Sequence, residues 1–309
     1  MTGDALRSVN LRKIYRSRGA PETEALAGVS MFVARGERVA LLGRNGAGKT
    51  TFLKIASTLL RPTSGSIEVL GIDVDRHPEA ARPFIAVVPQ EGKPFFHLTP
   101  REQVYTYLRA RGIDRKTARQ RTDEALAQMD LTDFADRLSM TLSGGQRQRT
   151  MVATVVATEA PLLFLDEPTI GMDPFARRRV WESFRQLTRK GSTLLLTTHY
   201  LDEAEALSQR LYIIEEGRVL VEGTSDELKR QVGGSIKVSI HEGVPHRASF
   251  ASFGTGVAEG STLHVIVEPG TLPEIMQTAL AMNLTASVGP VTLEEAFLRV
   301  VGRQIDSEE

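Results

Sequence analysis

An eight-residue segment has the residue types and spacing of a phosphate-binding loop. Gly43-Arg44-Asn45-Gly46-Ala47-Gly48-Lys49-Thr50 fits G-x-x-x-x-G-K-[ST], and it follows an apolar run and precedes a helical pattern. Its glycines let backbone N–H groups close around phosphate oxygens, and a helix N-terminus adds partial positive charge. We expect Lys49 to reach the β and γ phosphates and the Thr50 hydroxyl to bind Mg²⁺. The predicted nucleoside triphosphate site comprises Gly43, Asn45, Gly46, Ala47, Gly48, Lys49, Thr50 and Thr51.

A second apolar run ends in two acids. Leu162–Leu165 is followed by Asp166 and Glu167, and only a strand beside the phosphate loop could bring these acids to the metal and the terminal phosphate. We expect Asp166 to hold Mg²⁺, directly or through water, and Glu167 to polarise the attacking water. General-base assistance of this kind contributes roughly a hundred- to ten-thousandfold in rate. By itself, the run is equally consistent with a strand end that carries a solvated acid pair.

A third segment, Ser143-Gly144-Gly145-Gln146, has the pattern of a capping box. Its two glycines leave backbone N–H groups uncovered, so the helix that follows would present an anion-binding end. Standing alone, the segment is consistent with an ordinary helix start. A chain that binds one nucleotide through Lys49 has no obvious use for a second phosphate site, unless that site serves a neighbouring subunit.

The order of these three motifs resembles that of the nucleotide-binding subunits of ATP-binding cassette (ABC) transporters, over about residues 5 to 228. Four further residues resemble elements of the family. Gln90 resembles the glutamine of the loop that senses Mg²⁺, water and the transmembrane partner, and Asp173 lies in a segment similar to the loop that crosses the dimer seam. His199 resembles the switch histidine that contacts the γ phosphate, and Tyr15 is similar to the aromatic residue that stacks on adenine. In isolation, each is equally consistent with a turn, strand-end or surface residue.

The resemblance implies a fold, ligands and an assembly. The fold is α/β, a P-loop ATP-binding cassette with an antiparallel β subdomain and a helical subdomain. The ligands are ATP and Mg²⁺, with Thr50, Gln90 and Asp166 at the metal and Glu167, His199 and Gln90 in catalysis. ATP would lie in a head-to-tail dimer, between Lys49 and Thr50 of one subunit and Ser143 and Gly145 of the other. We call the segment Ser143–Gln146 the signature segment. The partners are a second nucleotide-binding subunit and transmembrane permease subunits at the cytoplasmic face of the cell membrane.

Residue patterns place these motifs on secondary structure. Alternating residues at Val29–Val33, a turn and an apolar run at Arg38–Leu42 predict a hairpin and a buried strand before the loop. The apolar runs at Leu162–Leu165 and Thr193–Thr197 predict buried parallel strands. The charged region of about residues 91–158 predicts a helical subdomain. Within this region, Thr99 is followed by Pro100 and, two residues later, by Glu102, a pattern that is typical of a helix N-terminus.

The texture of the chain changes after residue 228. We expect a cassette over residues 1–228 and a small α+β domain over 229–309, with strands at Ile236–Ile240 and Leu263–Val267 and a polar loop between them. Thr292 is the expected cap of a closing helix, whose apolar residues form one stripe: Leu293, Ala296, Phe297, Val300 and Val301. The stripe could pack on the small domain's own core, or it could form a dimer contact with a regulatory role.

Composition excludes several classes of protein. Lysine plus arginine and aspartate plus glutamate both number 38 in the 309 residues, so no net field favours nucleic acid. Cysteine is absent, which removes disulfides and thiolate metal sites, and the histidines show no metal-ligand spacing. No apolar run reaches the roughly 18 residues that a membrane-spanning helix requires. We therefore expect a soluble chain, or one docked on a membrane protein.

The closing segment Pro290–Leu298 resembles the tail of cassette subunits that serve exporters of drugs, polyketides, lipids or polysaccharides. Those subunits pair with separate membrane proteins. Two alternatives stay open: an importer subunit, and a regulatory or assembly ATPase with the same dimer chemistry. A cassette ATPase that acts on ribosomes or DNA would be expected to have two cassettes, a long coiled coil or cysteine pairs, and this sequence has none of them.

Overall fold

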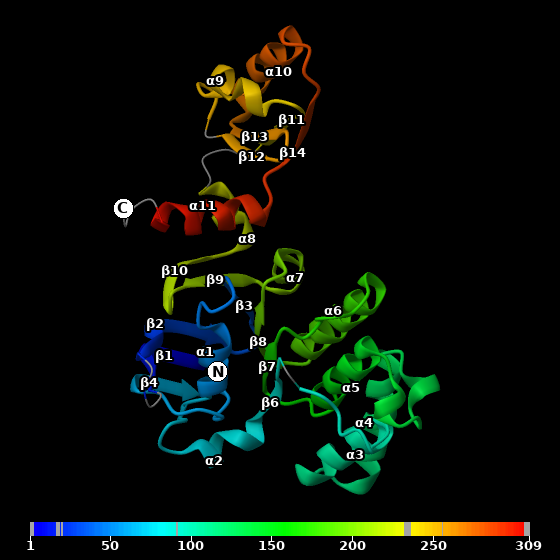
Figure 1. Cartoon of the computed structure of the whole chain (residues 1–309). Coiled ribbons are helices and arrows are strands. Elements are labelled where there is room, and N and C mark those ends of the chain that lie inside the picture. Colours follow the sequence, from blue (N-terminus) through cyan, green and yellow to red (C-terminus); the bar gives the residue numbers. More distant parts are fainter. Residues whose placement is uncertain are drawn as a thin grey trace. The chain divides into compact units, whose positions relative to one another are not determined.

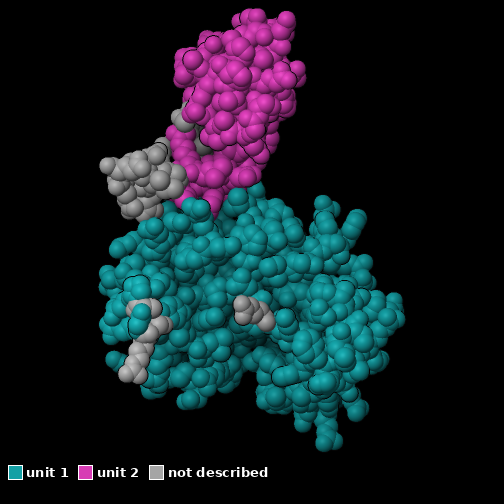
Figure 2. Space-filling model, viewed as in Figure 1, with its two compact units in different colours: residues 1–221 teal, residues 222–309 magenta. Residues whose placement is uncertain are grey.

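The computed structural model describes residues 3–16, 19, 21–90, 92–231, 236–254 and 256–305. The chain forms two compact units, residues 1–221 and 222–309 (Figure 2). The first unit ends at residue 221, seven residues before the expected end of the cassette at residue 228. No described helix has the length and apolar character needed to cross a membrane.

The described part of unit 1 is organised around a six-stranded sheet with the strand order β10-β9-β3-β8-β7-β6 (Figure 1). Adjacent strands from β9 to β6 are parallel. The buried strands expected from the apolar runs are confirmed. The six strands are β3 (Arg38–Leu42), β6 (Ile85–Val88), β7 (Leu162–Asp166), β8 (Thr193–Thr198), β9 (Arg210–Glu215) and β10 (Arg218–Gly223).

A second sheet in unit 1 is antiparallel, with the order β2-β1-β4-β5. Alternate residues of β2, Val29, Met31 and Val33, are buried, as the alternating sequence predicts. They join one apolar core with Phe52 of the first helix and Phe164 of β7. This core packs the second sheet and helix α1 on the six-stranded sheet. The elements are β1 (Asp4–Tyr15), β2 (Thr23–Ala34), α1 (Lys49–Ala56), β4 (Ser64–Val69) and β5 (Ile72–Asp73).

The helical region of unit 1 contains α3, α4 and α5, which pack on one another (Figure 1). The helix start expected after Thr99 is confirmed: its hydroxyl accepts a bond from the N–H of Glu102, whose carboxylate accepts one from the N–H of Thr99. Besides α1, the described α-helices of this unit are α2 (Pro78–Ala81), α3 (Pro100–Ala110), α4 (Arg115–Gln128), α5 (Gly144–Val156), α6 (Pro174–Arg189) and α7 (Leu201–Leu207).

Unit 2 contains an antiparallel sheet with the order β12-β13-β11-β14. The two expected strands and the expected closing helix are confirmed. The expected polar loop between the strands is wrong, because a short helix buries Phe250 there and a further strand pairs with β13. The elements are α8 (Ser225–Arg230), β11 (Ile236–Ile240), α9 (Arg247–Phe250), β12 (Gly256–Glu259), β13 (Thr262–Val267), α10 (Leu272–Ala281), β14 (Ala286–Pro290) and α11 (Leu293–Ile305).

The closing helix α11 packs on α8 of the same unit (Figure 1). Leu293, Ala296 and Val301 of its apolar stripe are buried. The backbone N–H of Thr292 donates to Glu295 at 2.8 Å, as expected of the helix start. The internal-packing explanation of the stripe therefore accounts for its buried residues within one chain.

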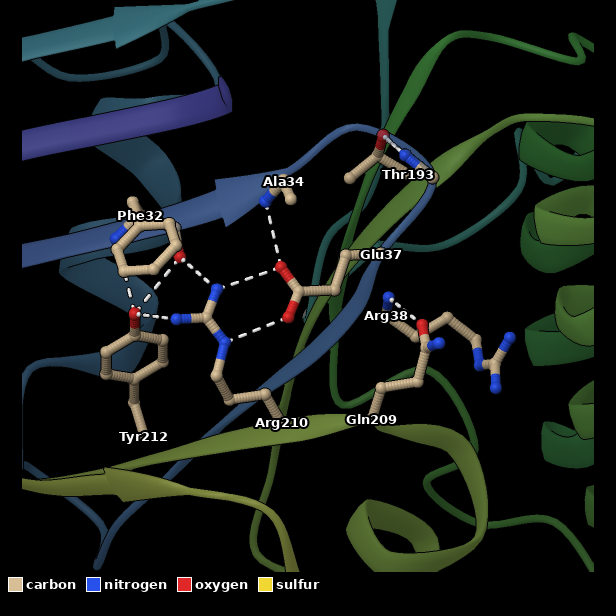
Figure 3. Close-up of polar contacts among 9 residues, drawn as sticks. Phe32, Ala34, Glu37, Arg38, Thr193, Gln209, Arg210 and Tyr212 are labelled. Atoms are coloured by element: carbon tan, nitrogen blue, oxygen red, sulfur yellow. Dashed lines mark hydrogen bonds and ion pairs between the residues drawn. The ribbon is translucent and has the colours of Figure 1, made fainter. Parts of the chain in front are cut away.

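One arginine connects the turn between β2 and β3 with the start of β9 (Figure 3). Both oxygens of Glu37 accept bonds of 2.8 Å from the Arg210 guanidinium. The guanidinium also lies 4.0 Å from the centre of the Phe32 ring and donates to the Tyr212 hydroxyl at 2.9 Å. A paired, mostly buried bidentate contact of this kind fixes geometry as well as charge. It ties the antiparallel sheet to the six-stranded sheet.

We expect Arg210→Met to lower the free energy of unfolding by about 3 kcal/mol, because it leaves the Glu37 carboxylate buried without its charge partner. The matched control is Arg12→Met, which removes an ion pair with Glu24 whose side chains are 40% and 38% exposed. The control is expected to cost less than about 1 kcal/mol. Urea denaturation measures both, and equal costs would contradict the structural role of Arg210.

Candidate functional site

A cavity of about 210 Å³ opens at the start of α1. The strands that precede its polar residues are parallel, so their carboxyl ends meet at one edge of the sheet. That edge brings together residues from the phosphate loop, from the segment after β6 and from the end of β7. The lining residues are Ala25, Asn45, Gly46, Gly48, Lys49, Thr50, Thr51, Gln90 and Glu167.

At two positions of the loop, neighbouring backbone atoms leave no room for any residue except glycine. A Cβ on Gly43 would lie 2.3 Å from the carbonyl oxygen of Ile214, and one on Gly48 would lie 2.5 Å from that of Ala25. Gly48 also has a φ of 106°, which strains any other residue. These contacts press the loop against β9 and β2. The first N–H groups of α1 are thereby held at the cavity without side chains over them.

Lys49 carries the only charge of the loop that is buried. Its ammonium donates to the carbonyl oxygens of Gly43 at 2.8 Å and Arg44 at 3.0 Å. Burial lowers the pKa of Lys49, and the nearby Glu167 and Asp166 carboxylates oppose that shift. A phosphate chain would offer this ammonium a negative partner that the two carbonyl groups only approximate.

Oxygen atoms suited to a divalent cation surround Thr50. Its Oγ1 lies 3.2 Å from Oδ1 of Asp166 and 3.3 Å from Oε1 of Gln90. Burial raises the pKa of Asp166, while hydrogen bonds from Thr197 and Thr50 oppose that rise. Among the described residues, no three or more His, Cys, Asp or Glu side chains are grouped so that they could hold a metal ion by themselves. Because Mg²⁺ takes one or two carboxylates and fills its other positions with water and phosphate oxygens, this donor set fits it.

Glu167 and His199 form a pair at the end of β7 and β8. Oε2 of Glu167 lies 2.7 Å from Nδ1 of His199. The backbone of Glu167 has a φ of 50°, an uncommon conformation for a residue with a side chain, and its N–H donates to Thr197 at 3.0 Å. This geometry turns a buried carboxylate into the cavity beside a half-exposed imidazole. An acid and a base in contact next to a phosphate site can move a proton.

Tyr15 lies beside the same loop. Its hydroxyl is 3.4 Å from Oγ1 of Thr51, and its ring is partly exposed, with the ammonium of Lys13 5.4 Å from the ring centre. The exposed ring therefore offers a surface on which a planar base could stack. Residues 17, 18 and 20, which follow it, lie outside the described residues.

The signature segment does not line this cavity. Ser143 caps α5 through the predicted box: its hydroxyl accepts from the N–H of Gln146 at 3.2 Å, and its own N–H donates to that side chain at 2.8 Å. Nothing lies within 4 Å of the place where Gly144 would carry a Cβ, whereas a Cβ on Gly145 would lie 3.3 Å from the carbonyl oxygen of Gly171. The first turn of α5 has no acidic residue. An exposed, positively polarised helix end results.

Asp173 serves as the cap of α6. Its carboxylate accepts bonds of 2.9 Å from the N–H groups of Phe175 and Ala176, and these bonds lower its pKa. The side chain is thus committed to the helix and does not line the cavity. The segment before it, at Gly171, packs on the signature segment.

Sequence reasoning missed two residues of the site. Ala25 lines the cavity from β2, and an alanine in a strand carries no chemical signal. The hydroxyl of Thr197 donates to Asp166 from the neighbouring strand. Its position in the buried run Thr193–Thr197 pointed to the strand, but only the register with β7 shows which carboxylate it meets.

The sequence of this chain is similar to those of ATP-binding proteins of ABC transporters. The family model described as ABC transporter matches residues 26–170. A daunorubicin resistance ATP-binding protein of Streptomyces coeruleorubidus is 38% identical over 292 residues, covering 91% of this chain and 92% of the relative. A Nod factor export ATP-binding protein I of Burkholderia pseudomallei is 37% identical over 283 residues, covering 90% and 92%.

A solved structure of similar fold is a dimeric ATP-binding cassette in a post-hydrolysis state, bound to ADP and phosphate. It has a TM-score of 0.66 and 27% sequence identity, and the match covers 71% of this chain and 98% of that chain. The sequence relatives align well beyond the 221 residues of unit 1, so the similarity includes part of unit 2. This chain belongs to the ATP-binding cassette family and is an ATP-hydrolysing nucleotide-binding subunit of an ABC transporter.

Proposed function

We propose that this chain drives an exporter whose membrane-spanning subunits are separate chains, from the cytoplasmic face of the membrane. Relatives named for drug resistance and for Nod factor export align over about nine tenths of the chain, which supports export over import. The observation that carries the mechanism is the division of phosphate-binding groups. One set lines a cavity with Glu167, and a second set lies exposed at the start of α5.

The cavity residues take the following roles. Lys49 and the loop N–H groups bind the β and γ phosphates of ATP, and the Tyr15 ring stacks on adenine. Thr50, Asp166 and Gln90 would hold Mg²⁺, which when bound neutralises charge on the phosphate oxygens.

Glu167 accepts a proton from the water whose oxygen attacks the γ phosphorus. The bond to the bridging oxygen of ADP breaks, and ADP and phosphate are the products. His199, whose imidazole contacts Glu167, moves its ring toward the γ phosphate to orient it.

The exposed end of α5 completes the site of a second copy. Ser143 and Gly144 are exposed and Gly145 is partly exposed, so their backbone groups are open to a second copy. The Gln146 side chain completes the capping box. The dimeric solved relative, bound to ADP and phosphate, supports the same arrangement. ATP between the P-loop of one subunit and the signature segment of the other closes a head-to-tail homodimer, and hydrolysis reopens it.

An exposed apolar surface offers a contact for the membrane subunit. Phe95 is 71% exposed and lies close in sequence to Gln90, with Phe96, Leu138 and Met140 also exposed. The N–H of Met140 donates to Phe96 at 3.2 Å, which holds the two segments together. A cluster of exposed aromatic and apolar side chains is typical of a protein interface. Because Phe95 follows Gln90 closely in the sequence, a membrane subunit that docks on Phe95 would be coupled to the metal site.

We expect Glu167→Gln to bind ATP and to favour a nucleotide-bound dimer, while hydrolysis falls by about a hundred- to ten-thousandfold, because the amide cannot accept the proton. Steady-state ATPase rates and size-exclusion chromatography with ATP measure the two effects. Glu124→Gln, an exposed acid on α4, is the matched control and should leave both unchanged. Turnover of Glu167→Gln within a few-fold of wild type would rule out Glu167 as the base.

Ser143→Arg should abolish hydrolysis with little loss of ATP affinity in the monomer, because the side chain blocks the signature segment and leaves the P-loop intact. Mixing this variant with Glu167→Gln leaves one intact composite site in each heterodimer. We expect roughly a quarter of the wild-type rate at equal mixing, since half of the dimers are then mixed and each has one of two sites.

Asp114→Ala, which removes the cap of α4, controls for the lost helix cap of Ser143→Arg, expected to cost about 1 kcal/mol. It should keep the wild-type rate. Absence of recovery in the mixture, or activity of the wild type at dilutions where it is monomeric, would disprove the shared site.

Phe95→Ser should reduce co-purification with the membrane subunit encoded by a neighbouring gene by about tenfold or more, because it removes an exposed aromatic anchor. The isolated chain should keep its ATPase rate. Leu280→Ser, which removes a side chain that is 75% exposed in unit 2, is the control. Equal loss in both variants would place the docking surface elsewhere. Failure of the wild type to bind such a subunit would favour a regulatory ATPase.

A further inference from the structure

A carboxylate that the reaction does not use is completely buried next to the site. Glu203, on α7, has no exposed surface. Its Oε1 accepts a bond of 2.7 Å from the Thr169 hydroxyl and one of 3.1 Å from Nε1 of Trp181. Because burying an ionisable group costs free energy unless it is well paired, such a residue in the interior calls for a physical reason.

The groups that meet at Glu203 come from the segments that carry the catalytic pair. Thr169 lies two residues after Glu167, and its hydroxyl donates to Glu203, while α7, which carries Glu203, starts two residues after His199. Thr169 is fully buried. One carboxyl group therefore joins the chain just after the base to the helix that follows the switch histidine.

The same carboxyl group also reaches the helix whose cap is Asp173. Trp181 lies on α6, and its indole N–H donates to the oxygen that Thr169 also contacts. On the other side of the loop, Nε2 of Gln148 in α5 donates to the carbonyl oxygen of Pro168 at 3.1 Å. The segment after Glu167 is thus held from two sides, by the signature helix α5 and by Glu203.

Hydrogen-bond donors and one arginine near Glu203 offset part of the cost of burying its carboxyl group. Burial raises the pKa of Glu203, and the hydrogen bonds from Thr169 and Trp181 and the charge of Arg177 oppose that rise. Arg177 itself donates to Asp202 at 3.1 Å and lies 4.6 Å from the ring centre of Tyr200. Oε1 of Glu203 has two donors, whereas its buried Oε2 has no hydrogen-bond partner among the described residues, and the carboxyl group does not line the cavity.

We propose that Glu203 is a positioning residue for ATP hydrolysis, which sets the spacing of Glu167 and His199 by tying Thr169 to α7, the helix that follows His199. The proposal rests on the proposed roles of Glu167 and His199. The 2.7 Å contact between the catalytic side chains is formed between two separate strand ends, and a small shift of either would open it. Glu203 acts as the common anchor of both.

The test compares Glu203→Ala with Glu203→Gln in the full chain. Because a misplaced catalytic group can cost about a hundredfold, we expect Glu203→Ala to lower kcat at least tenfold. KM and the directly measured ATP affinity should stay within about threefold, since the P-loop keeps its contacts. Glu203→Gln keeps an oxygen for Thr169 and Trp181 and should recover most of the lost rate.

A double variant separates positioning from a general loss of structure. If Glu203 acts through Glu167, adding Glu203→Ala to Glu167→Gln should lower the rate no further, because residues that act as a unit are non-additive. Ser8→Ala, which removes a different buried hydroxyl that bonds to Met31, is the control for stability and should leave kcat unchanged. Thr169→Val removes one hydrogen bond with little change of volume and serves if Glu203→Ala does not fold.

The outcomes are distinct. An additive double variant, an unchanged kcat in both Glu203→Ala and Thr169→Val, or a parallel loss of kcat and ATP affinity would overturn the role of Glu203. If the Glu167→Gln variant kept its activity, the proposed role of Glu167 as the base would be wrong. The role of Glu203 would then be judged from the kcat of Glu203→Ala and Thr169→Val by themselves.

Discussion

The tight packing of the phosphate loop is the constraint on which the rest of unit 1 depends. Gly43 approaches the carbonyl of Ile214 so closely that no side chain fits, and Gly48 does the same at Ala25. The turn after β9 adds two backbone bonds, from Gly217 to Ala47 at 3.0 Å and from Ala27 to Gly217 at 2.8 Å. Both sheets thus converge on the loop, and the Arg210–Glu37 pair joins the same two sheets at another point. The result is a rigid set of N–H groups, fixed before any phosphate arrives.

Several ionisable groups are buried around that loop against their intrinsic cost. Burial lowers the pKa of Lys49 and raises that of Asp166, so burial disfavours the charged form of each group. Phosphate and metal charges would supply the missing partners, and ligand binding would then stabilise the folded unit by mass action. Glu167 adds an unusual backbone angle to this set. A site that gains favourable contacts only when its substrate is bound is suited to coupling binding with movement.

In the proposed dimer, the second phosphate-binding element belongs to the site of the other copy. The signature helix α5 starts with an exposed first turn, which does not line the cavity of its own chain. Gly145 lies close to the segment of Gly171, and Gln148 donates to Pro168, so the helix proposed to meet a partner's ATP also touches the loop that follows Glu167. Through Glu203, that loop is connected to the His199 segment. In the proposed dimer, these contacts would connect closure at one site with the catalytic pair of the other.

By itself, the sequence determined the order of elements and most of the candidate site. A glycine-rich loop, an apolar strand with two acids and a capping box are local patterns, and the structure forms the same strands and helix starts. The predictions that failed or fell short depended on contacts between distant residues. The short helix and strand between β11 and β13 form because Phe250 and β13 offer partners that the polar sequence does not indicate. Only the tertiary structure decided that Ala25 lines the cavity, that Thr197 meets Asp166 and that Glu203 meets Thr169, because strand register and side-chain burial arise from packing across the sheet.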